Sequence, residues 1–174
     1  MSIDTAPLLP HALLCVRDAG GLSADDPSVP PPLLTAPPPL QTTTTGEEWM
    51  AYWQRTLAAS ETFETVNRRV DAFLDDFGDK PLRWASTQIK NQTPFPPTAD
   101  LGIDGAIRRL QRDYRSPLDD LDVAILGLAV TGDWRHISPD GVLVLASWDA
   151  LATAEHWMTD ALRPAAERAS SGRK

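Results

Sequence analysis

The chain has 174 residues, which is enough for one domain with a hydrophobic core. Its net charge of −8 argues against binding to nucleic acid or to an anionic membrane surface, because both kinds of binding depend on Lys and Arg. The single cysteine, Cys15, excludes an intrachain disulfide and a cysteine-based zinc site.

Targeting signals are missing from the sequence. The first residues lack the basic region and the apolar run of a signal peptide, and no stretch reaches the roughly 18 apolar residues of a membrane span. We therefore expect a cytoplasmic protein that does not enter a membrane. The excess of Arg over Lys, with abundant Ala and Pro, indicates GC-rich coding and hence a bacterial source.

Residues 1–45 are predicted to form a Pro-rich tail, flexible or docking, ahead of the folded domain. Two runs of three prolines favour extended spacers. Between residues 6 and 16 the tail is apolar, and the sequence allows a short helix from His11 to Asp18, ended by Gly20 and Gly21. This apolar piece either packs back on its own domain or serves as a partner-binding arm.

One long helix is predicted from Glu47 to Phe77, a stretch without Pro or Gly that Thr44 or Thr45 can cap. Large apolar residues recur along it at a mean spacing of about 3.5 if Ser60 is counted as a gap, which indicates one apolar seam. The seam residues are Trp49, Trp53, Leu57, Phe63, Val66, Val70, Phe73 and Phe77. Such a helix spans about 45 Å, so we expect later helices or a second copy of the protein to cover its seam.

An acidic stripe follows the end of this helix, where Asp71, Asp75 and Asp79 share one face with Asp76 beside them. We interpret the stripe as a solvated surface, because carboxylates on one helix face do not surround a cation. The sequence therefore predicts no metal site.

A second helix is predicted from Asp104 to Tyr114, with arginines along one side of its apolar stripe. Arginine binds phosphate and carboxylate groups in a bidentate manner, so these side chains are the candidate site for an anion or a partner. The alternative is that they face the acidic stripe or water. The cluster consists of Arg108, Arg109, Arg112 and Arg115.

For the segment that begins at Ser116 and Pro117, the sequence allows either a helix or a strand. Apolar residues at spacings of three, four and three favour a buried helix, which is the preferred prediction. Those residues are Leu118, Leu121, Ile125 and Leu128. A strand from Val123 to Thr131 is the alternative, since the run is apolar on all sides and Gly127 weakens a helix.

A β-hairpin is predicted near residues 134–146, because a Pro-Asp-Gly turn at 139–141 joins two β-rich runs. Ser147 then caps a last helix from Trp148 to about Ala169, which Pro164 is expected to disturb. Together the elements predict an α+β protein, predominantly helical. In it, one long central helix packs against two or three further helices and a small hairpin within residues 46–170.

No motif for catalysis, metal binding or cofactor binding accompanies these elements. The histidines His11, His136 and His156 lie far apart, and His136 is a second candidate as a general base because charged residues surround it in sequence. We therefore predict no catalytic residue and no cofactor. A winged-helix DNA reader is also excluded, since its recognition helix would carry three aspartates.

Two functional hypotheses follow. The first is a non-catalytic interaction protein, such as an adaptor, a regulator or an immunity-type inhibitor. It would act through its acidic surface and apolar seam on another protein or a second copy of itself. The second is a small enzyme or ligand-binding domain that recognises an anionic small molecule through the Arg cluster, with His136 near the reacting atom. A pocket joining the cluster to His136 would favour the second hypothesis.

Overall fold

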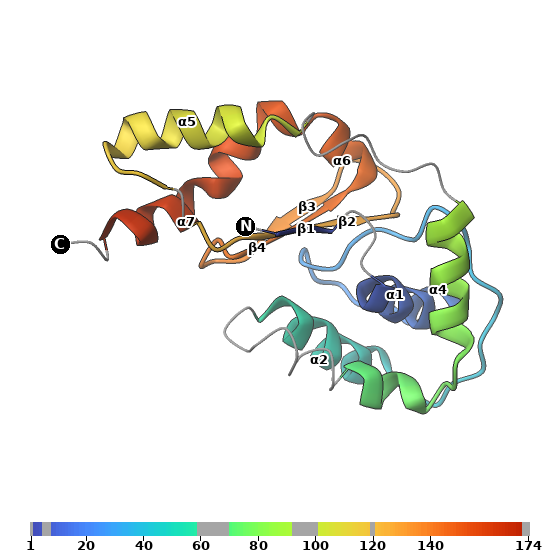
Figure 1. The fold of residues 1–174 in the computed structure, drawn as a ribbon. Helices are drawn as coiled ribbons and strands as arrows, with labels where there is room; N and C mark the ends of the chain where they lie inside the picture. The colour runs from blue at the N-terminus through green and yellow to red at the C-terminus, as the bar shows by residue number, and fades with distance from the viewer. Residues whose placement is uncertain (1, 5–7, 59–69, 92–100, 119–120, 172–174) are drawn as a thin grey trace.

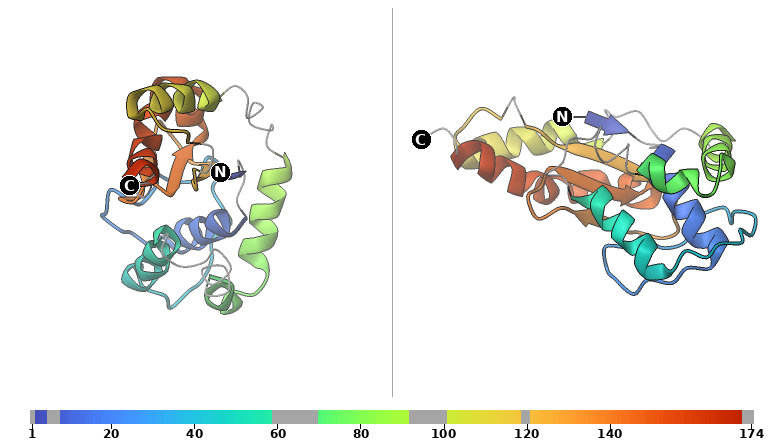
Figure 2. Two further views of the ribbon diagram at one scale, coloured as in Figure 1. Left: turned by 60° about the vertical axis from the view of Figure 1, so that its left-hand side comes forward. Right: turned by 90° about the horizontal axis from the view of Figure 1, so that it is seen from below.

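Two layers of helices enclose a small mixed sheet in the computed structural model (Figure 1). The structure describes residues 2–4, 8–58, 70–91, 101–118 and 121–171. The left view in Figure 2 also shows the two helical layers apart, on either side of the sheet. The fold is mixed α and β and mainly helical, as the sequence predicts.

The sheet has the strand order β1-β2-β4-β3. Three strands run parallel, namely β1 (Ser2–Asp4), β2 (Ala124–Leu128) and β4 (Leu143–Ser147). The edge strand β3 (Arg135–Ile137) is antiparallel to β4 and joins it through a turn that contains Gly141 at a φ of 69°. The predicted hairpin is confirmed.

The strand β2 occupies the segment for which a helix was the preferred prediction, and that prediction is wrong. Ile125 packs in the core on one face of the sheet, whereas Leu126 and Leu128 pack in the core on the other. A strand that is buried on both faces is apolar throughout and loses the alternation by which strands are recognised. The spacing that resembled a helical stripe therefore arose from two buried faces.

The helices α1 (Leu8–Gly20), α2 (Gly46–Leu57) and α4 (Lys80–Asn91) lie on one side of the sheet (Figure 1). Their apolar side chains form one hydrophobic cluster with Leu126 and Leu145. Helix α1 is the central member of this layer, since it packs against both α2 and α4.

The opposite layer contains α5 (Ile103–Tyr114), α6 (Trp148–Ala152) and α7 (Met158–Ser171), and α5 packs along α7. The helix predicted from Asp104 to Tyr114 is thus confirmed. Within the described residues, no helix has both the length and the apolar character required to cross a bilayer.

The segment predicted as a Pro-rich tail is part of the core. Helix α1 contains the short helix predicted there, and its Leu13, Leu14 and Val16 are 0% exposed. The apolar piece therefore packs on its own domain, which was one of the two alternatives. A sequence rich in proline is typical of a spacer, but here it joins α1 to α2 and packs against the end of β2.

The Pro-rich residues that follow α1 are held against the end of β2. Leu33 forms an isolated antiparallel bridge with Val130, and the Leu34 N–H donates to the carbonyl of Ala129 at 2.8 Å. The Thr131 N–H donates to the carbonyl of Pro32 at 2.9 Å. These bonds hold the segment along the carboxyl end of the central strand β2. We call residues 27–34 the Pro-rich strap.

The continuous helix predicted from Glu47 to Phe77 is wrong. Helix α2 begins with the capping box that Thr45 forms, and it ends at Leu57, after which Ala58 has a ψ of 89°. Residues 70–75 are helical again, whereas residues 59–69, with two of the predicted seam residues, lie outside the described residues. The chain leaves the helical conformation at Ala58, so the predicted seam is interrupted directly after Leu57.

The seam of α2 is nevertheless covered, and much of its cover precedes it in the chain. Trp49 and Trp53 are 0% exposed, with their rings stacked at a centroid distance of 5.7 Å. The Trp49 indole N–H donates to the carbonyl of Leu13 at 2.8 Å, and the Trp53 indole N–H donates to that of Ser28 at 3.0 Å. Thus α1 and the Pro-rich strap cover the seam together with later residues, as we expected in part, since Leu74 and Ala85 belong to the same hydrophobic cluster.

The last predicted helix is present in two parts. Ser147 caps α6 as predicted, accepting a hydrogen bond from the Ala150 N–H. The interruption falls at the short 3-10 turn η2 (Ala154–His156), because the Trp157 indole donates to the Ala150 carbonyl that a continuous helix would use. The disturbance expected at Pro164 is absent, since α7 continues through it.

Two leucines of the predicted tail test whether this segment belongs to the core. Leu14→Ala is expected to lower the free energy of unfolding by about 2–5 kcal/mol, because a fully buried side chain is lost. Leu34→Ala, at a residue that is 48% exposed, should change it by less than about 0.5 kcal/mol. Urea denaturation followed by circular dichroism measures both, and equal effects would contradict the structure.

Candidate functional site

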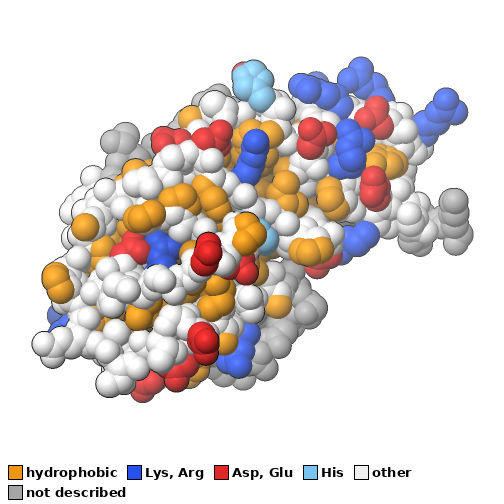
Figure 3. Space-filling model, turned by 180° about the vertical axis from the view of Figure 1, so that it is seen from behind, with side chains coloured by type: hydrophobic (Ala, Val, Ile, Leu, Met, Phe, Trp, Pro, Cys, Tyr) orange, Lys and Arg blue, Asp and Glu red, His pale blue; other side chains and the backbone are white. Residues whose placement is uncertain are grey.

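The four arginines of the candidate cluster are all exposed. Helix α5 buries Ile103, Ala106 and Leu110 on the side that packs against α7, and its arginines face solvent. Arg108 and Arg112, with Gln111, line a shallow hollow of about 430 Å³. In Figure 3, Lys and Arg side chains gather toward the end of the molecule at which α5 and α7 lie.

The Arg cluster does not face the acidic stripe. Asp71, Asp75, Asp76 and Asp79 are exposed on the other helical layer. Asp79 directly precedes α4, where a carboxylate is favourable, and it forms an ion pair with Arg83 one turn along the helix. Of the two alternatives for the arginines, exposure to water is the one observed. Among the described residues, no three metal-ligating side chains come together.

The Arg cluster and His136 lie on opposite faces of the sheet. Side chains alternate along β3, and the Arg135 guanidinium lies 5.2 Å from the centre of the Trp157 ring, in the layer that holds α5. The side chain of His136 therefore faces the other layer, where its charge interacts with that of Asp26. The structure does not join the Arg cluster and His136 in one pocket.

The surroundings of His136 are those of a structural side chain. Burial lowers the pKa of His136, and the nearby Asp26 opposes this effect only in part. The imidazole stacks beside Trp134 at a centroid distance of 6.5 Å. Asp26 accepts hydrogen bonds from the hydroxyl and backbone N–H of Ser28, and these bonds lower the pKa of the carboxyl group.

Two further reactive residue types are buried in structural roles. His11 is 1% exposed, and its Nε2 accepts a hydrogen bond from the Ala129 N–H at 2.9 Å, which ties α1 to the end of β2. Burial, with a smaller contribution from the charge of Asp18, raises the pKa of the Cys15 thiol to about 12. The thiol therefore stays protonated and is a poor nucleophile at neutral pH.

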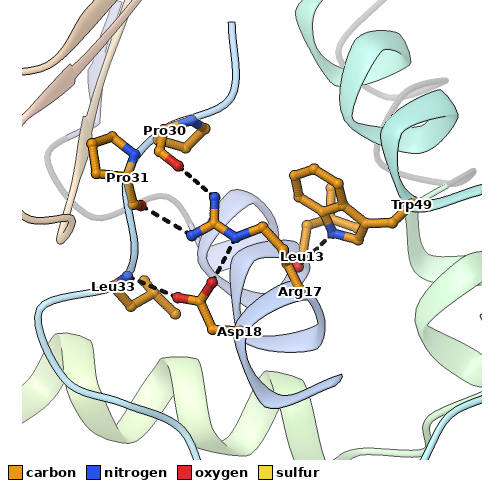
Figure 4. Close-up of polar contacts among 7 residues, drawn as sticks. All are labelled: Leu13, Arg17, Asp18, Pro30, Pro31, Leu33 and Trp49. Carbon is orange, nitrogen blue, oxygen red and sulfur yellow. Dashed lines mark hydrogen bonds and ion pairs between the residues drawn. The ribbon is translucent and has the colours of Figure 1, made fainter. Parts of the chain in front are cut away.

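A buried charged residue that the sequence analysis did not single out organises this layer (Figure 4). Arg17 is 5% exposed, and its Nε bonds the carboxylate of Asp18 at 2.6 Å. The two terminal nitrogens donate to the carbonyls of Pro30 and Pro31, the second at 3.0 Å. The other carboxylate oxygen of Asp18 accepts the N–H of Leu33 at 2.8 Å.

The buried carbonyls of the proline run explain why an arginine is needed at position 17. An extended run of prolines has no internal hydrogen bonds, so its carbonyls need donors from elsewhere once they are buried. The guanidinium supplies donors in a fixed planar fork, whereas an ammonium would not match two successive carbonyls. The signal in the sequence was an Arg-Asp pair at the end of an apolar helix ahead of a proline run.

Two hollows lie on either side of the loop at residues 23–26. The first has a volume of about 510 Å³ and is bounded by the Pro-rich strap, Arg17 and Trp134. The second has a volume of about 430 Å³ and lies between the loop and α2, with Asp25, Asp26 and Glu47 in its lining. Neither hollow is predicted from the sequence, because the Pro-rich composition of this segment is typical of a tail.

Comparison with known proteins provides no relative. No protein-family model matches the chain, and the searches of curated proteins and of solved structures returned no significant match.

Arg17→Met tests the buried arginine. The substitution keeps most of the apolar volume but leaves the Asp18 carboxylate and two carbonyls without their donor, so we expect a loss of about 3 kcal/mol in the free energy of unfolding. Arg83→Met removes an exposed ion pair and should cost less than about 0.5 kcal/mol. Chemical denaturation of both variants checks this, and similar values for the two would refute the role of Arg17.

His136 should make stability depend on pH. Burial lowers its pKa below the ordinary 6.5, so between these values the unfolded state binds the proton more readily than the folded state. This part of the stability is fully present above pH 6.5 and is lost as the pH falls toward the folded pKa. His136→Gln should flatten this slope in thermal unfolding, whereas His156→Gln, at an exposed histidine, should leave it unchanged.

Proposed function

We propose that this protein is a non-catalytic interaction protein, an adaptor, a regulator or an immunity-type inhibitor, that binds a basic protein partner through its acidic surface. The observation that carries the proposal is the distribution of charge. Among the described residues, the layer of α1, α2 and α4 exposes seven carboxylates and four Lys or Arg side chains, whereas on the opposite layer the exposed arginines of α5 lie among carboxylates such as Asp104, Asp113 and Glu167. The seven carboxylates are Asp25, Glu47, Glu48, Asp71, Asp75, Asp76 and Asp79.

The physical basis is electrostatic steering. Carboxylates of one sign that share a face attract a cationic partner and accelerate its association, most strongly at low ionic strength. A protein with a net charge of −8 keeps this attraction over much of its surface. Basic nucleases and other cationic proteins are partners of this kind.

The apolar seam of α2 is not available to a partner and is not part of the proposed binding surface. Trp49, Trp53 and Phe73 are at most 5% exposed, since the chain covers them itself. A partner would therefore meet mainly charged and polar side chains on this layer, with apolar contacts in its hollows and at the exposed Leu8 and Leu34. Interfaces of this composition suit association that is fast and sensitive to salt.

The second hypothesis has one favourable observation, the hollow between Arg108 and Arg112. The described residues that line this hollow all belong to α5, and His136 lies across the sheet from it. We therefore retain the second hypothesis only as a proposal that the hollow binds an anion, without a catalytic role.

Charge neutralisation distinguishes the two hypotheses. A partner captured from the source cell extract and identified by mass spectrometry should associate more slowly with Asp71→Asn/Asp75→Asn/Asp76→Asn, by about three- to tenfold at low salt. The variant Arg108→Gln/Arg112→Gln/Arg115→Gln should not reduce the rate. Surface plasmon resonance at about 50 and 500 mM salt measures both. A rate that only the arginine variant reduces would favour the anion-binding alternative.

A further inference from the structure

The two hollows beside the loop at residues 23–26 form one groove, and we propose that it binds an arginine-containing segment of the partner protein, with an apolar residue next to the arginine. The inference rests on the proposed function and adds the place and the chemistry of recognition. We call this place the Asp25 groove. The lining residues on which the proposal rests are Asp25, Asp26, Glu47, Pro27, Val29 and Trp134.

The two hollows share one wall. Ser23, Ala24 and Asp25 line both, so the loop forms a ridge between a hollow of about 510 Å³ and one of about 430 Å³. A peptide of a few residues that crosses this ridge would place neighbouring side chains on either side of Asp25. The volumes are in the range of sites that hold small ligands or single side chains.

The α2 side of the groove is acidic. Asp25 and Glu47 are exposed there, and Asp26 is held in its charged form by two hydrogen bonds from Ser28. Met50 and Ala51 add an apolar floor to the same hollow. Carboxylates beside an apolar floor complement the charged head and the methylene stem of an arginine.

The strap side of the groove is apolar and aromatic. Pro27, Val29 and the half-buried Trp134 line it. A guanidinium stacks on the face of tryptophan better than an ammonium does, and prolines offer a hydrophobic surface of low flexibility. The Trp134 ring is already held parallel to that of His136, with an angle of 12° between the planes.

The one basic side chain in the lining does not compete with an incoming cation. Arg17 is paired with Asp18 and donates to the carbonyls of Pro30 and Pro31, so its charge is compensated locally. An anionic ligand would find this guanidinium already occupied and would meet Asp25 and Glu47. Charge complementarity therefore selects a basic occupant.

The groove is also preorganised. The Arg17 bonds to Pro30 and Pro31 fix the strap wall, and the Trp53 indole fixes the backbone of the same wall by donating to the Ser28 carbonyl at 3.0 Å. The bridge between Leu33 and Val130 joins the strap to the sheet. Walls that are held before binding lose little conformational entropy when a ligand arrives.

A nuclear magnetic resonance titration tests the proposal with a defined probe. The blocked peptide acetyl-Gly-Arg-Leu-Arg-Gly-amide is added to the full-length ¹⁵N-labelled protein. We expect shifts in the amides of residues 22–29 and in the Trp134 indole. The peptide with Lys in place of Arg should bind about two- to fivefold more weakly, and the peptide with Glu should not bind.

Matched variants locate the site. Asp25→Asn should weaken binding of the arginine peptide at least about fivefold, because it removes the carboxylate common to both hollows. Asp76→Asn makes the same charge change on the acidic stripe and should alter the affinity less than about twofold. Trp134→Leu should reduce the preference for Arg over Lys, provided its spectrum keeps the dispersion of the folded protein.

The outcomes separate this inference from the proposed function. Shifts confined to residues 70–79 would overturn the groove and leave an acidic binding surface. No shift at up to about 10 mM peptide would overturn both, since even weak specific sites bind at that concentration. Equal effects of Asp25→Asn and Asp76→Asn would reduce the binding to general electrostatics and also overturn the groove.

Discussion

The fold depends on the burial of two indoles, each of which needs a carbonyl acceptor. Trp49 and Trp53 enter the core side by side, and an indole N–H without a partner is costly in that environment. The acceptors are the carbonyls of Leu13 and Ser28, which belong to residues earlier in the chain. This requirement brings α1 and the Pro-rich strap onto α2, and the strap in turn needs Arg17 to satisfy its own carbonyls. The candidate groove is a consequence of this arrangement, because the loop between α1 and the strap forms its ridge.

The sheet separates the molecule into two layers with different chemistry. On one layer, α5 presents arginines to solvent while it packs along α7. On the other, carboxylates surround the groove, and the titratable residues His11, Cys15 and Arg17 are buried in structural contacts. Residues that looked like parts of one active site in the sequence are thus divided between two surfaces.

Local signals in the sequence predicted the elements that local chemistry controls. The turn at residues 139–141, the Thr45 capping box, the Ser147 cap and the stripe of α5 are all present. Each depends on residues within a few positions of one another. The errors concern elements whose state depends on distant partners. The strand β2 is apolar on both faces because a helical layer covers each, and α1 looked like part of a tail because its partners come later. The groove could not be predicted for the same reason, since Trp134 and Asp25 are far apart in sequence and line the same hollow only in the folded protein.

The parallel pairing of β1 with β2 has a consequence for folding. Ser2 lies opposite Ala124, and β2 then pairs with β4, so the central strand gains both neighbours only when most of the chain has been synthesised. Contacts of such long sequence separation close slowly, because the entropy of the intervening loop must be lost first. Until then the leucines of α1 have no sheet to cover. A nascent chain of this protein would leave the ribosome with an exposed apolar helix, and it would depend on chaperones or rapid completion to avoid aggregation.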